Sequence, residues 1–365
     1  MRDRPCETLA TLCASEEGAT FYQIILFWTD NLLKFFSAIS RGIFNCIIKS
    51  IIELKTELNY INFSYQTNSN KEYNISLSYQ LFGKDLFSAP IILVNHALTG
   101  NSDVSGEKGW WKKLIGENQV IDTNKYTVLC FNIPGNGYDN FLIDEYEDFT
   151  PSDIANIFLK GLDILNIKSL YAIIGGSLGG GIGWEMLVKN PPLAEIFIPI
   201  ACDFKTHDWL HAQCLVQKFL LNRNDEPLQK ARIHAMLCYR TPQSLNYRFQ
   251  NKYNQEKQSL ESEDWLIYHG NALNERFSLK SYKLMNHLLM NINVEETQLE
   301  KIQARMHMIS VDTDLFFPAS EIRMCFERLK EKKENVFYHE ITSIHGHDAF
   351  LMEYEQLNNI IKNIL

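Results

Sequence analysis

The sequence lacks the signatures of several large protein classes. None of its eight cysteines forms a C-x-x-C pair, so the chain has neither a zinc-ribbon spacing nor a redox motif. Scattered cysteines are typical of buried, reduced thiols, and we expect a cytoplasmic setting and no bound metal. Positive charge is scarce, because 35 Lys and Arg face 44 Asp and Glu and leave a net charge of −9. A field of that sign repels polyanions, so we expect no nucleic-acid partner.

A long uncharged apolar run is also missing. From Ile25 to Ile51 apolar residues recur at intervals of three or four positions, the pattern of an amphipathic helix. Asp30 and Lys34 interrupt it, so no stretch reaches the roughly 18 residues of a membrane-spanning helix. We therefore expect no membrane partner. Residues 1–53 are predicted to be a leader. The alternatives are a helix packed against the domain and a helix that lies at a membrane surface or a dimer interface.

What the sequence does contain is enough apolar material for a large core, since 45% of its 365 residues are hydrophobic. Two alternating segments, residues 60–65 and 73–82, predict an antiparallel hairpin. Short apolar runs separated by helical stretches then predict parallel strands covered on both faces. These runs are residues 91–94, 126–132, 170–174, 196–200, 307–311 and 335–340. Residues 203–305 show helical periodicity, which predicts a helical insertion in a single catalytic domain of residues 54–365.

A nucleophile elbow stands after one of the predicted strands. The sequence Gly175-Gly-Ser177-Leu-Gly179 matches G-x-S-x-G, in which a sharp strand-to-helix turn presents the serine hydroxyl. Glycines are needed there because the turn crowds the neighbouring backbone. A phosphate-binding loop is the alternative, but neither G-x-G-x-x-G nor G-K-[ST] can be placed here. We predict that Ser177 is a nucleophile and that the Leu178 N–H points at a developing oxyanion.

An acid and a histidine follow in the order that such a fold requires. Asp314 ends one predicted strand, and His347 lies in the loop after the last one. Asp312 and His345 are the alternative acid and base. A metal cluster around His345 and His347 is a weaker interpretation, because further His and Asp at short spacing are missing.

The second oxyanion donor is expected in the loop that follows an earlier strand. The run 91–94 leads directly into His96-Ala-Leu98-Thr-Gly100, and the Leu98 N–H is our candidate. The alternative is an ordinary loop that exposes the imidazole of His96.

Taken together, several separated motifs resemble the homoserine O-acetyltransferase family. The resemblance extends from about residue 58 to the C-terminus and implies an α/β-hydrolase fold with a mostly parallel sheet and a helical lid. The matching segments are His96–Gly100, Gly109–Trp111, Leu114–Gly116, Ile121–Thr123, Gly176–Gly180, Ala231–Arg232, Tyr239–Thr241, Tyr268–Gly270, Arg276–Phe277, Ser281–Tyr282 and Gly346–Leu351. Two segments beside the nucleophile depart from the family pattern, Asn132–Asp139 and Leu178–Ile182.

The resemblance implies that an acetyl or succinyl group passes from CoA to the hydroxyl of homoserine through an acyl-serine, in methionine biosynthesis. Acyl-CoA is then a co-substrate, no cofactor is bound, and the protein is a homodimer. By the same resemblance Arg232 and Tyr239, about two helical turns apart, bind the homoserine carboxylate, and Asp348 accepts its ammonium. A surface ion pair for Arg232, a packed ring for Tyr239 and a cap of the C-terminal helix for Asp348 are the alternatives.

Two other functions remain open. A serine esterase or other hydrolase would use the same triad and differ only in the final acceptor. A non-enzymatic interaction protein would keep the triad unused and act through the N-terminal helix.

Overall fold

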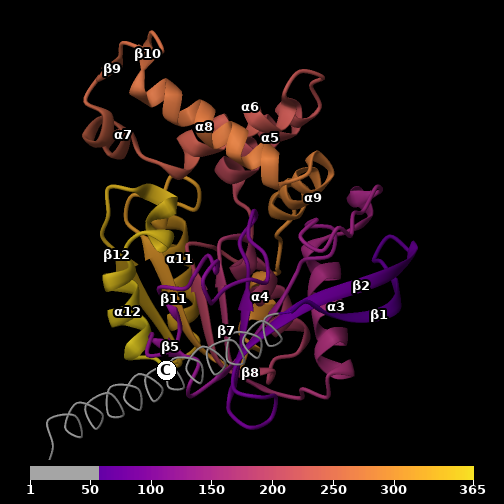
Figure 1. Cartoon of the computed structure of the whole chain (residues 1–365). Coiled ribbons are helices and arrows are strands. Elements are labelled where there is room, and N and C mark those ends of the chain that lie inside the picture. The colour runs from indigo at the N-terminus through magenta and orange to yellow at the C-terminus, as the bar shows by residue number, and fades with distance from the viewer. Residues whose placement is uncertain (1–56) are drawn as a thin grey trace, which may run out of the picture. The chain divides into compact units, whose positions relative to one another are not determined.

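The centre of the protein is an eight-stranded sheet (Figure 1). The computed structural model describes residues 57–365, so the predicted leader lies outside the described residues. The strand order is β1-β2-β6-β3-β7-β8-β11-β12. The strands are β1 (Asn59–Gln66), β2 (Glu72–Gly83), β3 (Ile91–Asn95), β6 (Thr127–Phe131), β7 (Leu170–Gly176), β8 (Ala194–Ile200), β11 (Arg305–Val311) and β12 (Val336–Ile341).

The sheet is antiparallel at one edge and parallel elsewhere. The strand β1 pairs antiparallel with β2, as the alternating segments predict, and β2 pairs antiparallel with β6. All other neighbours are parallel, from β6 to β12. Every residue of β3 and β6 is buried, which explains why these strands are continuous apolar runs in the sequence.

Different elements cover the two faces of the sheet. Helices α3 (Pro151–Ile164), α4 (Leu178–Lys189) and α11 (Ala319–Lys330) bury their apolar residues in a core on one face. The opposite face is covered by α12 (Tyr354–Lys362) and by side chains of the long connection between β3 and β6. Trp111 in this connection is fully buried and contacts Phe350 edge to face. The same connection contains the two-residue strands β4 (Ile115–Gly116) and β5 (Ile121–Asp122), which the sequence did not predict.

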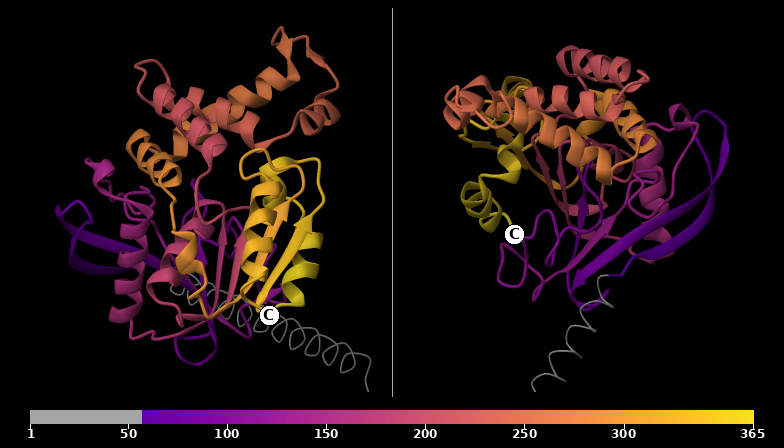
Figure 2. Two further views of the ribbon diagram at one scale, coloured as in Figure 1. Left: turned by 180° about the vertical axis from the view of Figure 1, so that it is seen from behind. Right: turned by 45° about the horizontal axis from the view of Figure 1, so that its top comes forward.

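The chain between β8 and β11, which we call the helical insertion, lies above one end of the sheet (Figures 1 and 2). It consists of α5 (Asp208–Leu221), α6 (Pro227–Tyr239), α7 (Pro242–Phe249), α8 (Glu261–Arg276), α9 (Leu279–Met290) and the short α10 (Glu296–Leu299). It also holds two paired strands of two residues each, β9 (Tyr253–Asn254) and β10 (Ser259–Leu260), where we expected none. Within residues 57–365, none of the helices is both long and apolar enough to cross a bilayer.

Candidate active site

Ser177 lies at the sharp turn between β7 and α4. Its backbone has φ +54° and ψ −126°, a conformation that residues other than glycine rarely adopt. The neighbouring glycines are required by crowding. A Cβ atom on Gly175 would lie 2.4 Å from the carbonyl oxygen of Gly179, and one on Gly179 would lie 2.2 Å from that of Asn95. The turn therefore brings the start of α4 against the end of β3.

The three residues predicted as nucleophile, base and acid are joined by hydrogen bonds. The Ser177 hydroxyl donates to His347 Nε2 across 3.0 Å, and His347 Nδ1 donates to Asp314 Oδ2 across 2.7 Å. All three side chains are buried. In this arrangement the imidazole can take the serine proton, and the carboxylate sets the tautomer that makes this possible.

Backbone groups and aromatic rings hold the acid and the base in place. The other carboxylate oxygen of Asp314, Oδ1, accepts from the N–H groups of Phe316 and Phe317, at 2.7 and 2.9 Å. The imidazole of His347 is surrounded by rings, with centroid distances of 5.0 Å to Phe316 and 5.3 Å to Phe350. Such packing excludes water from the imidazole and restricts its rotation.

The alternative acid and base have other partners. Asp312 Oδ1 accepts from the Ser343 N–H at 2.9 Å and so supports the loop that carries His347. His345 Nδ1 accepts from the Ser244 hydroxyl at 2.8 Å and from Arg240 Nη1 at 3.3 Å. Neither residue forms a hydrogen bond with Ser177 in the part of the chain that is described.

The two predicted oxyanion donors lie on the segments that meet at the elbow. Leu178 begins α4, and Leu98 lies in the loop directly after β3. Among the described residues, neither N–H donates to another backbone group. His96 is buried, contrary to the alternative of an exposed imidazole: its Nδ1 donates to Ala97 O and its Nε2 accepts from the Ile133 N–H at 3.0 Å. Burial lowers its pKa to about 4, so the ring stays neutral and supports the loop.

The predicted substrate residues come from two regions. Arg232 and Tyr239 share α6, with the guanidinium 5.5 Å from the centroid of the tyrosine ring. Tyr239 is buried and its ring lies 5.6 Å from that of His347, so one edge of α6 borders the triad. Arg232 makes no ion pair with the described residues. Asp348 lies beside His347 in a short 3-10 helix, Gly346–Leu351, and does not cap α12, whose N-cap is Glu353.

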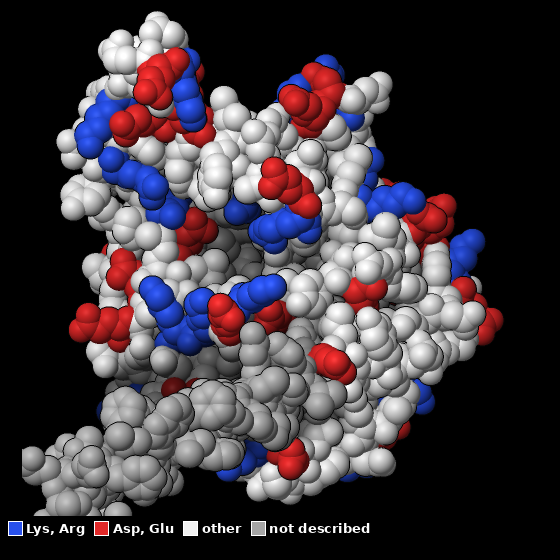
Figure 3. Space-filling model, in the orientation of Figure 1, with Lys and Arg blue, Asp and Glu red and all other residues white. Residues whose placement is uncertain are grey.

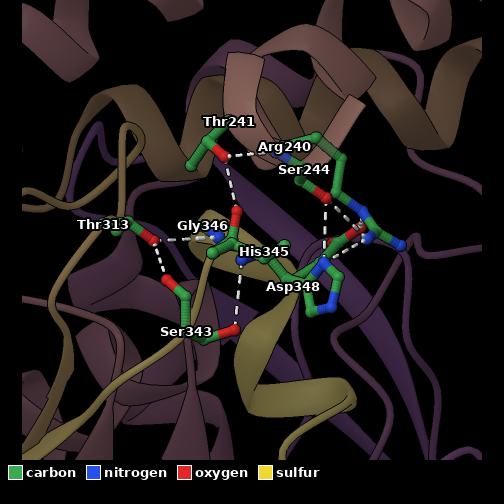
Figure 4. Close-up of polar contacts among 9 residues, drawn as sticks. Arg240, Thr241, Ser244, Thr313, Ser343, His345, Gly346 and Asp348 are labelled. Carbon is green, nitrogen blue, oxygen red and sulfur yellow. Dashed lines mark hydrogen bonds and ion pairs between the residues drawn. The ribbon is translucent and has the colours of Figure 1, made fainter. Parts of the chain in front are cut away.

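Arg240 is a site residue to which the sequence analysis gave no role. Its Nε donates to Asp348 Oδ2 across 2.7 Å, and both side chains are largely buried. Figure 4 shows Arg240 and Ser244 of the insertion converging on His345 and Asp348, which flank His347 in its loop. The only sequence signal was its place in Tyr239–Thr241, one of the segments that resemble the family.

The surface near the helical insertion is hollowed. In Figure 3 a depression separates the upper, helical part from the lower part, and Lys and Arg side chains lie on both of its rims. Partial burial and the nearby Arg232 guanidinium lower the pKa of Arg276, so these two cations lie close together. Within residues 57–365, no group of His, Cys, Asp or Glu is arranged to hold a metal ion. The close pair of guanidinium groups favours an anionic ligand over a cation.

Comparison with known proteins identifies the fold and similar sequences. A family model described as alpha/beta hydrolase fold matches residues 90–195. The homoserine O-acetyltransferase of Cyclobacterium marinum is 29% identical over 343 residues, which cover 86% of this chain and 95% of that protein. The homoserine O-acetyltransferase of Methanococcus vannielii is 29% identical over 340 residues, covering 81% of this chain and 69% of that protein.

Solved structures show the same fold. The homoserine O-acetyltransferase from Bacillus anthracis superimposes with a TM-score of 0.75 at 18% identity, covering 84% of this chain and 97% of that one. Esterase E22 superimposes equally well, with a TM-score of 0.75 at 17% identity, covering 84% and 99%. The chain has the α/β-hydrolase fold, and it is similar over most of its length to homoserine O-acetyltransferases.

Proposed function

We propose that this protein transfers an acyl group, acetyl or succinyl, from CoA to the hydroxyl of homoserine in methionine biosynthesis. One observation carries the proposal: the hydrogen-bonded series Ser177, His347 and Asp314 lies beside a helix that presents Arg232 and Tyr239. The similarity to homoserine O-acetyltransferases over most of the chain supports the same conclusion.

In the first half-reaction, the Ser177 hydroxyl attacks the thioester carbonyl and its proton passes to His347 Nε2. The Leu98 and Leu178 amides stabilise the negative oxygen of the tetrahedral intermediate. One such donor is typically worth about 2.7–4 kcal/mol of barrier. When the intermediate collapses, the carbon–sulfur bond breaks and the departing CoA thiolate takes the proton from His347.

In the second half-reaction, the homoserine hydroxyl attacks the acyl-serine and gives its proton to His347. The bond to Ser177 Oγ then breaks, and the proton returns to that oxygen. Water competes for the same acyl group, so transfer requires a site that excludes it. We propose that the helical insertion is the lid that does this.

Three side chains would recognise the amino acid. We assign the carboxylate to Arg232, assisted by Tyr239, because a guanidinium can bind both carboxylate oxygens. The absence of an ion-pair partner for Arg232 within residues 57–365 leaves its charge available. Asp348 would accept the ammonium through Oδ1. Its Oδ2 accepts from Arg240, whereas Oδ1 makes no hydrogen bond within the described chain.

The decisive assay measures free thiol from acetyl-CoA with and without homoserine. We expect thiol release that depends on homoserine and a product that is O-acetylhomoserine. Thiol release at the same rate without homoserine, with acetate as product, would refute the transferase.

A serine esterase is the second candidate, and one observation favours it. The segment Leu178–Ile182 departs from the family pattern, and a Cβ atom on Gly181 would lie 2.5 Å from Ile292 Cδ1. Ile292 therefore fills the space where a longer side chain at position 181 would lie. Gly181 lies one helical turn after Ser177, whose carbonyl accepts from the Gly181 N–H at 3.2 Å. We propose that altered packing beside the nucleophile changes the acyl preference, with rapid hydrolysis of short esters as the outcome.

We also propose a cytoplasmic homodimer. Acyl-CoA and free amino acids are intracellular substrates, and the described cysteines are free thiols. The insertion exposes large apolar side chains, among them Phe219 on α5 and Ile267 on α8, which a second copy could cover. We expect Phe219→Asp with Ile267→Asp to give monomers by analytical ultracentrifugation, whereas Tyr60→Asp on β1 leaves the mass unchanged. A monomeric native protein would contradict this.

A further inference from the structure

We propose that the helical insertion aligns the catalytic loops through two arginines, Arg240 and Arg276. Arg240 contacts the loop that carries His347, and Arg276 contacts the loop after β3 that carries Leu98. Neither arginine reaches the reacting atoms, so both are positioning residues. This inference rests on the proposed acyl-serine chemistry of Ser177.

Arg240 extends from the end of α6 to both sides of His347. Its Nε donates to Asp348, which follows His347, and its Nη1 donates to His345, which precedes it by two residues. Nη1 also lies 3.4 Å from the Ser244 hydroxyl, which itself donates to His345. A planar guanidinium with several donors in one rigid group can define the position of a loop in a way that a single ammonium cannot.

The chain beside Arg240 strengthens this contact (Figure 4). The Thr241 hydroxyl donates to the Ile344 carbonyl. It also accepts from the Ser244 N–H, and Thr241 thereby caps the start of α7. Gly346 packs so closely that a Cβ atom there would lie 2.9 Å from the Tyr239 carbonyl oxygen. The catalytic loop therefore lies directly against the corner between α6 and α7.

Arg276 makes the corresponding contact at the other half of the site. It is the last residue of α8, and its Nη1 donates to the Thr99 carbonyl oxygen across 3.1 Å. Thr99 directly follows Leu98, the proposed oxyanion donor. A shift of that loop by about 1 Å would displace the N–H from the oxyanion, and misplacements of this size can cost about a hundredfold in rate.

The two contacts predict different kinetic signatures. Loss of Arg240 frees the loop that carries His347 and breaks the ion pair with Asp348, so acylation slows, and a lysine, which can still pair with Asp348, recovers part of the rate. Loss of Arg276 frees only the loop that carries Leu98, so kcat for acylation falls while KM for the ester stays close to native. A merely structural role would lower the thermal stability together with the rate and would give no recovery with lysine.

The experiment uses the full chain and p-nitrophenyl acetate, whose burst of nitrophenol reports acylation of Ser177 without any acceptor. Arg240→Gln, Arg240→Lys and Arg276→Gln are compared with Arg223→Gln, a matched control in the turn after α5. We expect acylation to fall about ten- to a hundredfold in both Gln variants, in kcat rather than in KM. Arg240→Lys keeps the charge and can still pair with Asp348, so we expect a burst between those of the native protein and Arg240→Gln.

Outcomes for this inference and for the proposed function are separable. If folded Arg240→Gln and Arg276→Gln acylate within twofold of the control, the positioning role is wrong, whichever acceptor the enzyme uses. If the native protein acylates and then only hydrolyses, the transferase proposal fails while the positioning test still stands. Circular dichroism and thermal unfolding of each variant exclude loss of the fold as the cause.

Discussion

The sheet region and the helical insertion differ in how much of their apolar surface they bury. Within α4, every residue from Leu178 to Leu187 is buried, whereas α8 buries only Gly270 and Leu273. The sheet core also holds the triad in a closed set of hydrogen bonds. The insertion instead leaves Arg232 without an acidic partner in the described chain and exposes large apolar residues such as Phe219. We infer that the sheet provides stability and the reacting groups, and that the insertion provides recognition.

The sheet region is stable enough to tolerate a strained residue at its centre. A non-glycine residue in the conformation of Ser177 costs on the order of 1–3 kcal/mol, and it persists only where its surroundings determine the backbone. Here the Ser177 N–H donates to the Ile200 carbonyl at 2.9 Å, and the elbow glycines allow the start of α4 to lie against the end of β3. Substitutions in the two regions should therefore affect different properties.

The largest effect is expected from Ser177→Ala. It removes the nucleophile, and acyl transfer should fall by about 10⁴-fold or more, because the remaining triad members act only together with the serine. The loss should appear equally in nitrophenol burst and in thiol release from acetyl-CoA. An unchanged burst in this variant would refute the triad.

A substitution in the insertion, Arg232→Met, should separate recognition from chemistry. Hydrogen bonds to charged groups contribute about 1.5–3 kcal/mol, so KM for homoserine should rise roughly ten- to a hundredfold. Acylation of Ser177 should stay close to native, since no acceptor takes part in it. Arg223→Met serves as the control, and equal KM values in the two variants would contradict the assigned role.

The sequence predicts the sheet well because buried parallel strands are continuous apolar runs, such as Ile91–Asn95. The elbow was identifiable from G-x-S-x-G, and chain order then restricted which acid and histidine could follow Ser177. The pairing of Arg240 with Asp348 was not, since 108 residues separate them and only the folded chain brings them together. The two-residue strands β4 and β5 are too short to carry a periodicity.

The sheet region should respond to acid through its buried histidines, of which His96 and His307 have the most strongly lowered pKa values. Burial lowers the pKa of His96 in the folded state to about 4 from an ordinary value of 6.5, so folding favours the neutral imidazole. The resulting stabilisation is fully present above about pH 6.5 and is lost as the pH falls toward 4. Near pH 5 the loss should be about 2 kcal/mol.

Urea unfolding near pH 7.5 and near pH 5 measures this dependence. In His96→Gln, whose side-chain oxygen can still accept from the Ile133 N–H, part of the dependence should disappear. The control is His211→Gln, an exposed position on α5 that should keep the native dependence. The assignment is wrong if His96→Gln retains the full difference between the two pH values.

The smallest effect tests the strain at the elbow itself. Ser177→Gly and Ser177→Ala both remove the hydroxyl, but only glycine adopts φ +54° and ψ −126° without penalty. We expect the glycine variant to unfold with a free energy about 1 kcal/mol above that of the alanine variant. At Ser152, in the first turn of α3, the order should reverse, because glycine destabilises a helix relative to alanine by roughly 0.5–1 kcal/mol. If the alanine variant has the higher free energy of unfolding at both positions, the backbone of Ser177 is not strained.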